Sequence, residues 1–134
     1  MVTTADEYKA LAAKVVSNFR DELGVELEYD QQSIEWLDGY INRVGPELQK
    51  EHVPGLATAL GAYLGETIIG TYGGAWAYFE QVDQWGIRFE DDSGAFPISK
   101  VYKQLEDGAF DSILSFFTML PKIRDHVNRQ QSDE

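Results

Sequence analysis

The chain has 134 residues, no cysteine and a formal net charge of −12, from 23 acidic residues against 11 lysine and arginine residues. This length suffices for one domain with a hydrophobic core, and the absence of cysteine excludes disulfides and thiolate chemistry. The charge opposes binding to nucleic acid or to anionic membranes unless a local basic stripe is present, and the sequence has none. A basic protein partner or a cation is the ligand that the charge favours, although such a charge also serves solubility alone.

Two sequence features bear on compartment and domain organisation. The start, MVTTADEYK, lacks the basic and apolar order of a signal peptide, and no apolar run approaches the roughly 20 residues of a membrane span. We therefore expect a cytoplasmic protein of bacterial type. The sequence predicts a single acidic domain over residues 1–128 and a frayed polar tail over residues 129–134.

The first predicted helix begins at a capping box formed by Thr4 and Glu7 and ends at Gly24. A second helix has Asp30 as its N-cap and ends at the Gly45-Pro46 pair.

Trp36 and Tyr40 lie in this second helix, but they fall beside its apolar stripe rather than on it. An aromatic pair in that position is a candidate contact patch for a partner.

The stretch from Leu56 to Trp76 predicts the central helix and the turn that follows it. Apolar residues recur every four positions, at Leu56, Leu60, Leu64 and Ile68. Beside them runs a row of small residues, Ala57, Gly61 and Gly65. Since each interior glycine costs roughly 1 kcal/mol relative to alanine, we expect another backbone to press against this row. Gly73 ends the helix, and Gly74 turns the chain into a strand that starts near Ala75.

From Gly74 onward the apolar period changes to two, which indicates strands. Two strands form a hairpin around the polar link at residues 81–84, and a short third strand at Ala95 and Phe96 is limited to the sheet edge by Pro97. A fourth helix is predicted from about Ile98 to Gly108. A last helix is predicted to start at an Asp111 cap and to kink or end at Pro121.

Glu66 is the candidate functional carboxylate, because it lies next to Gly65 and close to the apolar stripe of the central helix. If buried, it must be protonated or paired, and Arg88, Lys100 or Lys103 could supply the charge. A structural ion pair is the simpler interpretation, and a functional acid is the alternative. Trp76 and the other strand aromatics could line a ligand groove beside it, or could belong to the core.

Signals for catalysis are few. His52 and His126 are the only histidines, and neither belongs to a metal-binding pair such as HxxxH. The glycines of residues 70–74 follow a helix and precede a strand, which is the reverse of a phosphate-binding loop. We therefore expect no catalytic residue, no metal and no cofactor.

The second half of the chain contains a GAYLGE…GGxW…P…KV…DS pattern, carried by Gly61 to Glu66, Gly73-Gly74, Trp76, Pro97, Lys100-Val101 and Asp111-Ser112. In this pattern the chain resembles a family of small bacterial domains of unknown function. The resemblance implies that the glycines, Glu66 and Trp76 form a scaffold or a shared site. It implies no activity.

Taken together, the patterns predict an α+β fold in which about five helices pack on one face of a three-stranded antiparallel β-meander. The favoured function is a non-enzymatic interaction or regulatory module, of immunity type for example, that binds a basic partner. The alternative is a small-molecule-binding or hydrolytic domain that uses Glu66, Trp76 and Arg88 at the glycine corner. The sequence leaves the oligomeric state open.

Overall fold

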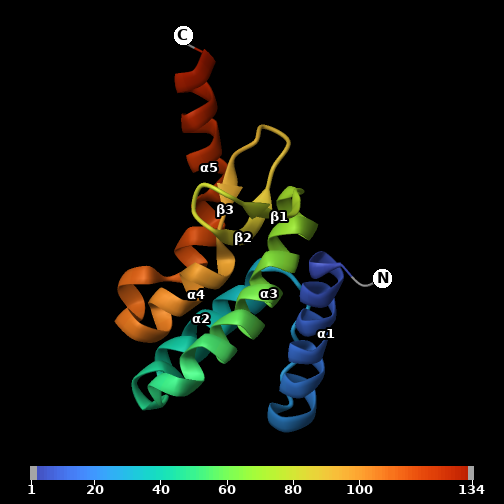
Figure 1. The fold of residues 1–134 in the computed structure, drawn as a ribbon. Coiled ribbons are helices and arrows are strands. Elements are labelled where there is room, and N and C mark those ends of the chain that lie inside the picture. The colour runs from blue at the N-terminus through green and yellow to red at the C-terminus, as the bar shows by residue number, and fades with distance from the viewer. Residues whose placement is uncertain (1–2, 133–134) are drawn as a thin grey trace.

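The computed structural model describes the backbone of residues 3–132, together with their side chains except those of residue 109 and residues 126–132. The described chain has an α+β fold (Figure 1). Its helices are α1 (Thr4–Leu23), α2 (Gln31–Val44), α3 (Val53–Tyr72), α4 (Pro97–Asp107) and α5 (Ile113–Ser132), and its strands are β1 (Ala75–Phe79), β2 (Gln84–Arg88) and β3 (Gly94–Ala95). Short 3₁₀ turns occupy Gly45–Glu47, Lys50–His52 and Gly108–Asp111. None of these helices is both long and apolar enough to cross a membrane.

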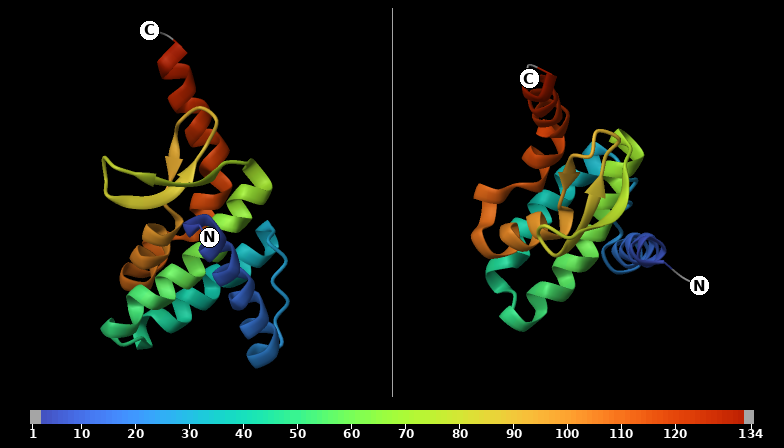
Figure 2. Two further views of the ribbon diagram at one scale, coloured as in Figure 1. Left: turned by 45° about the vertical axis from the view of Figure 1, so that its right-hand side comes forward. Right: turned by 45° about the horizontal axis from the view of Figure 1, so that its top comes forward.

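The strands form the predicted antiparallel meander in the order β1-β2-β3. Trp76 pairs with Ile87, which in turn pairs with Ala95, so these three side chains lie on one face of the sheet. All three are buried, and this face is directed toward the helices. Figure 2 shows the sheet at one end of the helical layer, with α5 passing beside it.

Helix α3 is the centre of the core, with ten buried residues among its 20. The predicted row of small residues lies against other elements. A Cβ at Gly61 would be 2.5 Å from Cα of Ile98 at the start of α4, and one at Gly65 would overlap the ring of Trp76. Ala57 is fully buried. These close approaches explain why glycine is present in the interior of a helix despite its conformational cost.

The end of α3 requires glycine for a different reason. Gly73 and Gly74 have φ angles of 88° and 96°, which L side chains rarely adopt. The N–H of Gly73 donates to the carbonyl of Ile69, and a Cβ at Gly74 would be 2.8 Å from Ile87. The predicted roles of both glycines, ending the helix and turning the chain into β1, agree with this geometry.

Two predicted helix starts are wrong by one residue. The capping box of α1 uses Thr3 and Asp6 instead of Thr4 and Glu7. The hydroxyl of Ser112, and not the carboxylate of Asp111, accepts a hydrogen bond from the N–H of Ser115 in the first turn of α5. In both places, neighbouring residues had side chains able to cap, and the Ser112 hydroxyl also donates to Asp38 of α2.

The last helix is longer than expected. Pro121 lies inside α5 and does not end it, and the helix includes residues 129–132 of the predicted polar tail. Residues 133–134 of that tail lie outside the described part of the chain.

Candidate functional site

The structure brings two of the predicted site residues together at the glycine corner. Nε1 of Trp76 donates a hydrogen bond of 2.8 Å to Oε2 of Glu66. The indole is 8% exposed, and the ring of Tyr8 packs on it at a centroid distance of 4.4 Å. The indole N–H is therefore satisfied by a carboxylate instead of water. The same packing buries part of the Tyr8 ring, and this burial raises the pKa of Tyr8.

An open hollow of about 200 Å³ adjoins this hydrogen bond, and we call it the corner hollow. Its polar lining comes from Asp6, Lys9 and Glu66. Hydrogen bonds from Thr3 lower the pKa of Asp6 below its ordinary value. Glu66 is half-buried, and it takes part in no ion pair with any residue whose side chain is described. The charged partner predicted for Glu66 from the sequence is thus replaced by an uncharged donor, Trp76.

Arg88 does not belong to this site. It pairs with Ala75, so it lies on the opposite face of the sheet from Trp76. Its guanidinium carbon is 4.5 Å from the centroid of the Phe79 ring, and its side chain is exposed. The sequence placed Arg88 with Glu66 because both residues lie near the glycine corner. The alternation of side chains along β2, however, puts Arg88 on the face of the sheet opposite Trp76.

Trp36 and Tyr40 form the aromatic pair that the sequence singled out, and both are half-buried. Their rings stack at 5.6 Å and 17°, and the edge of Phe19 contacts both rings. Arg43 lies over Trp36 at 5.7 Å. The pair is therefore fixed by α1 and by its own helix, with only part of its surface left for another molecule.

A second hollow, of about 250 Å³, lies beside Trp36, and we call it the acidic hollow. The carboxylate residues that line it are Glu26, Glu28 and Asp30, from the segment between α1 and α2. No lysine or arginine lines it. The segment between Arg20 and Arg43 contains seven acidic residues and no basic residue, a sequence signal that could have drawn attention to it.

Three hydrogen bonds fix the backbone of this segment. Backbone N–H groups of Glu28 and Tyr29 donate to the hydroxyls of Ser33 and Tyr63, at 2.9 and 3.0 Å. The N–H of Ser33 donates to Asp30 at 2.9 Å, and this bond lowers the pKa of the Asp30 carboxyl. Tyr29 has a φ angle of 56°, a left-handed conformation that is costly for a residue other than glycine. The carboxylates therefore project from a segment held in one conformation.

A buried polar network joins α2, α4 and α5, and nothing in the sequence indicated it. Oδ1 of Asp38 accepts from the Gln104 amide at 3.0 Å, the Ser112 hydroxyl at 2.8 Å and the Leu114 N–H at 3.2 Å. Gln104 is fully buried, and its Oε1 accepts from the N–H of Ile113. The network satisfies orphan N–H groups in the first turn of α5, which is a structural role.

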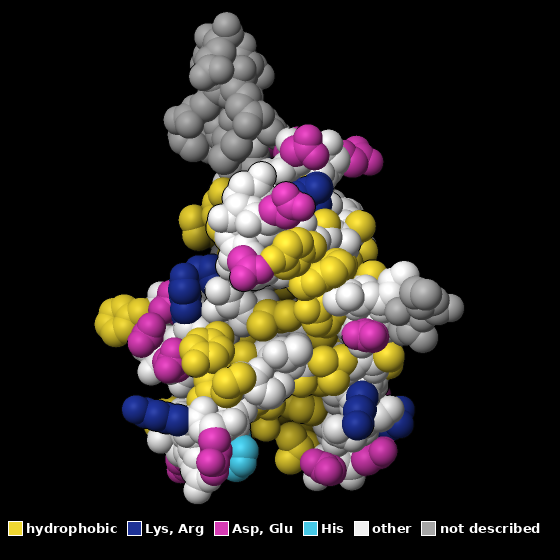
Figure 3. Space-filling model, viewed as in Figure 1, with side chains coloured by type: hydrophobic (Ala, Val, Ile, Leu, Met, Phe, Trp, Pro, Cys, Tyr) yellow, Lys and Arg dark blue, Asp and Glu magenta, His cyan; other side chains and the backbone are white. Residues whose placement is uncertain are grey.

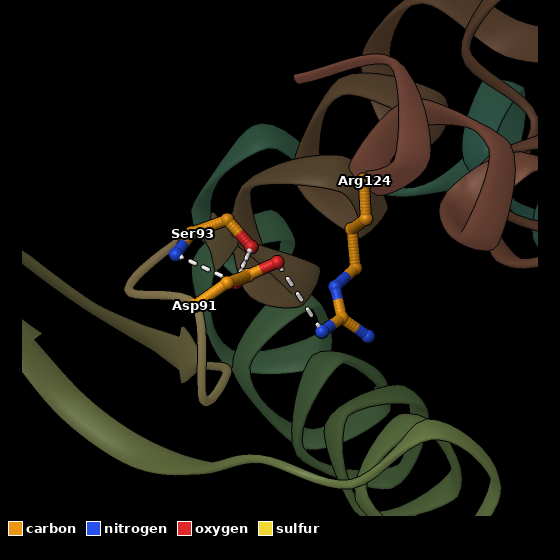
Figure 4. A network of polar contacts seen from close by, with 3 residues as sticks. All are labelled: Asp91, Ser93 and Arg124. Carbon is orange, nitrogen blue, oxygen red and sulfur yellow. Dashed lines mark hydrogen bonds and ion pairs between the residues drawn. The ribbon is translucent and has the colours of Figure 1, made fainter. Parts of the chain in front are cut away.

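Another polar contact ties the β2–β3 turn to α5 (Figure 4). Arg124 reaches from α5 to Asp91, with Nη2 3.4 Å from Oδ2, and its guanidinium carbon is 4.1 Å from the ring centroid of Phe89. Asp91 also accepts from the N–H and the hydroxyl of Ser93. These contacts hold the turn against the helix.

Among residues whose side chains are described, no group of three or more histidine, aspartate or glutamate side chains is arranged to hold a metal ion. His52 is exposed, and the side chain of His126 lies outside the described part. Comparisons with protein-family models, with curated proteins and with solved structures give no match.

Proposed function

We propose that this protein is a non-enzymatic interaction module that binds a basic segment of a partner protein at the acidic hollow. The observation that carries the proposal is the lining of that hollow, in which Glu26, Glu28 and Asp30 stand beside Trp36 with no basic residue among them. Carboxylates attract lysine and arginine, and an indole adds a flat apolar surface for their aliphatic stems or a cation–π contact.

The fixed conformation of residues 28–33 supports the same function. A segment that is already ordered loses little conformational entropy when a partner binds, so more of the interaction energy appears as affinity. The left-handed Tyr29 costs free energy in the isolated chain. Such a backbone conformation fits a loop whose shape serves recognition.

The proposal extends to the kind of partner and to the compartment. A net charge of −12 opposes nucleic acid and anionic membranes over most of the surface, so the partner is a protein. The chain has no cysteine to gain from an oxidising environment, which fits the cytoplasm.

A short lysine–alanine peptide, titrated against the ¹⁵N-labelled protein, tests the proposal. We expect shifts centred on residues 25–33 and on the indole of Trp36, with affinity that falls steeply between about 50 and about 300 mM salt because exposed charges are screened. The double variant Glu26→Gln/Glu28→Gln should weaken binding at least about fivefold.

The control must separate a site from general attraction to an acidic protein. Glu47→Gln/Glu51→Gln removes the same charge from two exposed glutamates on the 3₁₀ turns outside the hollow. Equal losses in the two double variants would show that the peptide senses net charge only and would contradict the proposal. Absence of binding at low ionic strength would contradict it as well.

The corner hollow favours a second candidate, a small-molecule-binding or hydrolytic domain. The half-buried carboxylate of Glu66 lies at the edge of an open hollow together with Lys9, and Trp76 offers an aromatic edge. A fragment screen by ligand-observed NMR tests this candidate. Hits that Lys9→Gln removes and that Lys14→Gln, an exposed lysine of the same helix, leaves unchanged would favour it; a screen without such hits would rule it out.

A further inference from the structure

Three exposed apolar side chains lie together on the first three turns of α5 and on the 3₁₀ turn before it. Phe110 is 97% exposed, and Met119 and Ile123 are about half exposed, at 51% and 47%. These residues line a hollow of about 230 Å³ together with Phe116. Side chains as apolar as these are costly to leave in water, and such patches on soluble proteins mark contact sites.

Another hollow, of about 280 Å³ and distinct from the acidic and corner hollows, continues this surface toward the hairpin. It lies between Val82 at the β1–β2 turn, Phe96 after β3, and the first turns of α4. Lys100 and Phe116 line both hollows. Because the two hollows meet at Lys100 and Phe116, together they form one elongated groove. Such a groove suits a linear segment of chain better than a compact small molecule.

The groove carries more positive than negative charge, in contrast to the protein as a whole. Lys100 and Lys103 line the hairpin half, where no acidic residue does, and Asp111 is the one acidic residue that lines the half beside α5. Neither lysine forms an ion pair with a residue whose side chain is described. Lys100 is half-buried, with Nζ 5.4 Å from the ring centroid of Phe116. On a chain with 23 acidic residues, the two lysines of the hairpin half, three positions apart on α4, form a local site for carboxylates.

From the apolar wall and the two lysines, we propose that this groove binds an acidic, amphipathic segment of a partner protein. Apolar side chains of that segment lie against Phe110, Phe116 and Met119, and its glutamate or aspartate residues face Lys100 and Lys103. The groove shares no lining residue with the acidic hollow. The inference therefore does not rest on the function proposed above, and it describes a second, oppositely charged contact surface.

The probe is a set of labelled helical peptides that carry glutamates beside a single apolar face and differ in the spacing of the apolar residues. Fluorescence anisotropy should show at least one peptide binding with a Kd below about 1 mM, and a peptide of the same composition in scrambled order should bind at least about tenfold more weakly. Lys100→Gln/Lys103→Gln and, separately, Phe110→Ala should each weaken binding about tenfold.

Matched controls use exposed residues outside the groove. Lys14→Gln/Lys50→Gln removes the same charge, and Leu23→Ala removes an exposed apolar side chain at the end of α1; each should change the affinity less than about twofold. Because the altered groove residues are exposed or half-exposed, circular dichroism should give the wild-type spectrum for every variant, which separates loss of binding from loss of fold.

Four outcomes would overturn the proposal. The first is the absence of binding by every peptide at about 1 mM. The second is equal binding of the scrambled peptide, which would indicate charge attraction alone. The third is binding of dodecanoate, and not of peptide, in a manner sensitive to Lys100→Gln/Lys103→Gln, which would indicate a small amphiphile. The fourth is a dimer in sedimentation equilibrium that Phe110→Ala dissociates, which would assign the groove to a second copy of the chain.

Discussion

The indole of Trp76 donates a 2.8 Å hydrogen bond to Glu66 while its ring occupies the space over Gly65, the residue just before that glutamate. One side chain from β1 is thus fixed to two consecutive positions of α3, by a polar contact at its N–H and by packing at its ring. A phenylalanine at this position would lack the donor, so this tryptophan fixes the start of β1 on α3 by both contacts together.

Replacing Glu66 tests this registration. Glu66→Leu removes the acceptor and leaves the N–H of a buried indole without its partner, so we expect a loss of about 1–2 kcal/mol in the free energy of unfolding. Glu66→Gln keeps an acceptor oxygen and should cost less. The indole Nε1–H resonance of Trp76 in a ¹⁵N–¹H spectrum reports the bond, and it should move in the leucine variant only. An unchanged resonance there would mean that the bond is absent in solution.

Alanine at two glycines of α3 should have opposite effects. At Gly61 the added Cβ would be 2.5 Å from the backbone of Ile98, and since α4 cannot move without disturbing the core, we expect a loss of about 1–3 kcal/mol. At Gly70 nothing lies within 4 Å, so the higher helix propensity of alanine should stabilise the fold by up to about 1 kcal/mol. Urea unfolding measures both, and losses of equal size would contradict the packing described at Gly61.

Burial raises the pKa of Tyr63 above the ordinary tyrosine value near 10, because it disfavours the charged phenolate. Because the pKa of Tyr63 is higher in the folded state than in the unfolded state, the neutral phenol contributes to the stability of the fold. This contribution is fully present below about pH 10 and is lost as the pH rises through the folded-state pKa. Tyr63→Phe should make the urea midpoint less dependent on pH above about 10. At pH 7 it should cost about 1 kcal/mol, because the N–H of Tyr29 loses its acceptor.

The exposed residue Tyr102 provides the comparison for that experiment. Tyr102→Phe should leave the free energy of unfolding at neutral pH within about 0.5 kcal/mol of the wild-type value. If it changed the alkaline limb as much as Tyr63→Phe does, the burial of Tyr63 would not be the cause.

The buried network predicts strong coupling between α2 and α4. Asp38→Ala removes the acceptor shared by Gln104, Ser112 and the first turn of α5, and we expect it to cost about 2–4 kcal/mol. In a double-mutant cycle with Gln104→Ala the two losses should fall short of additivity by at least about 1 kcal/mol. Asp111→Ala is the control, because Ser112 caps α5; a large loss there would restore Asp111 as the cap.

The fold was predictable wherever one residue pattern had one physical meaning. The apolar period of two after Gly74 specified the meander. The small-residue row specified the face of α3 on which other elements pack, since few other arrangements bury those residues. Cap positions were not predictable to one residue, because Thr3 and Thr4 carry the same hydroxyl and each has an acidic residue three positions later, Asp6 or Glu7.

The sequence brought together candidate residues that are close in the chain, but it did not reveal long-range contacts. Glu66 and Trp76 are ten positions apart and meet across one turn, whereas the Asp38–Gln104 bond joins residues 66 apart. Neither Asp38 nor Gln104 belongs to a motif, so only the tertiary structure could reveal that they meet. The segment between α1 and α2 is held in part by a hydrogen bond from the N–H of Tyr29 to the hydroxyl of Tyr63, which is far away in sequence.

The position of α3 limits how the protein can change shape. Ten of its residues are buried, and it packs against α1 and against α4, so opening its amides requires those contacts to be broken. We expect native-state hydrogen exchange to be slowest along this helix. Figure 3 shows hydrophobic side chains in the middle of the face that overlies it, with charged side chains mainly around the edge. Because exposing the core would require breaking the packing of α3, we expect a partner to bind the surface of the folded protein without opening it.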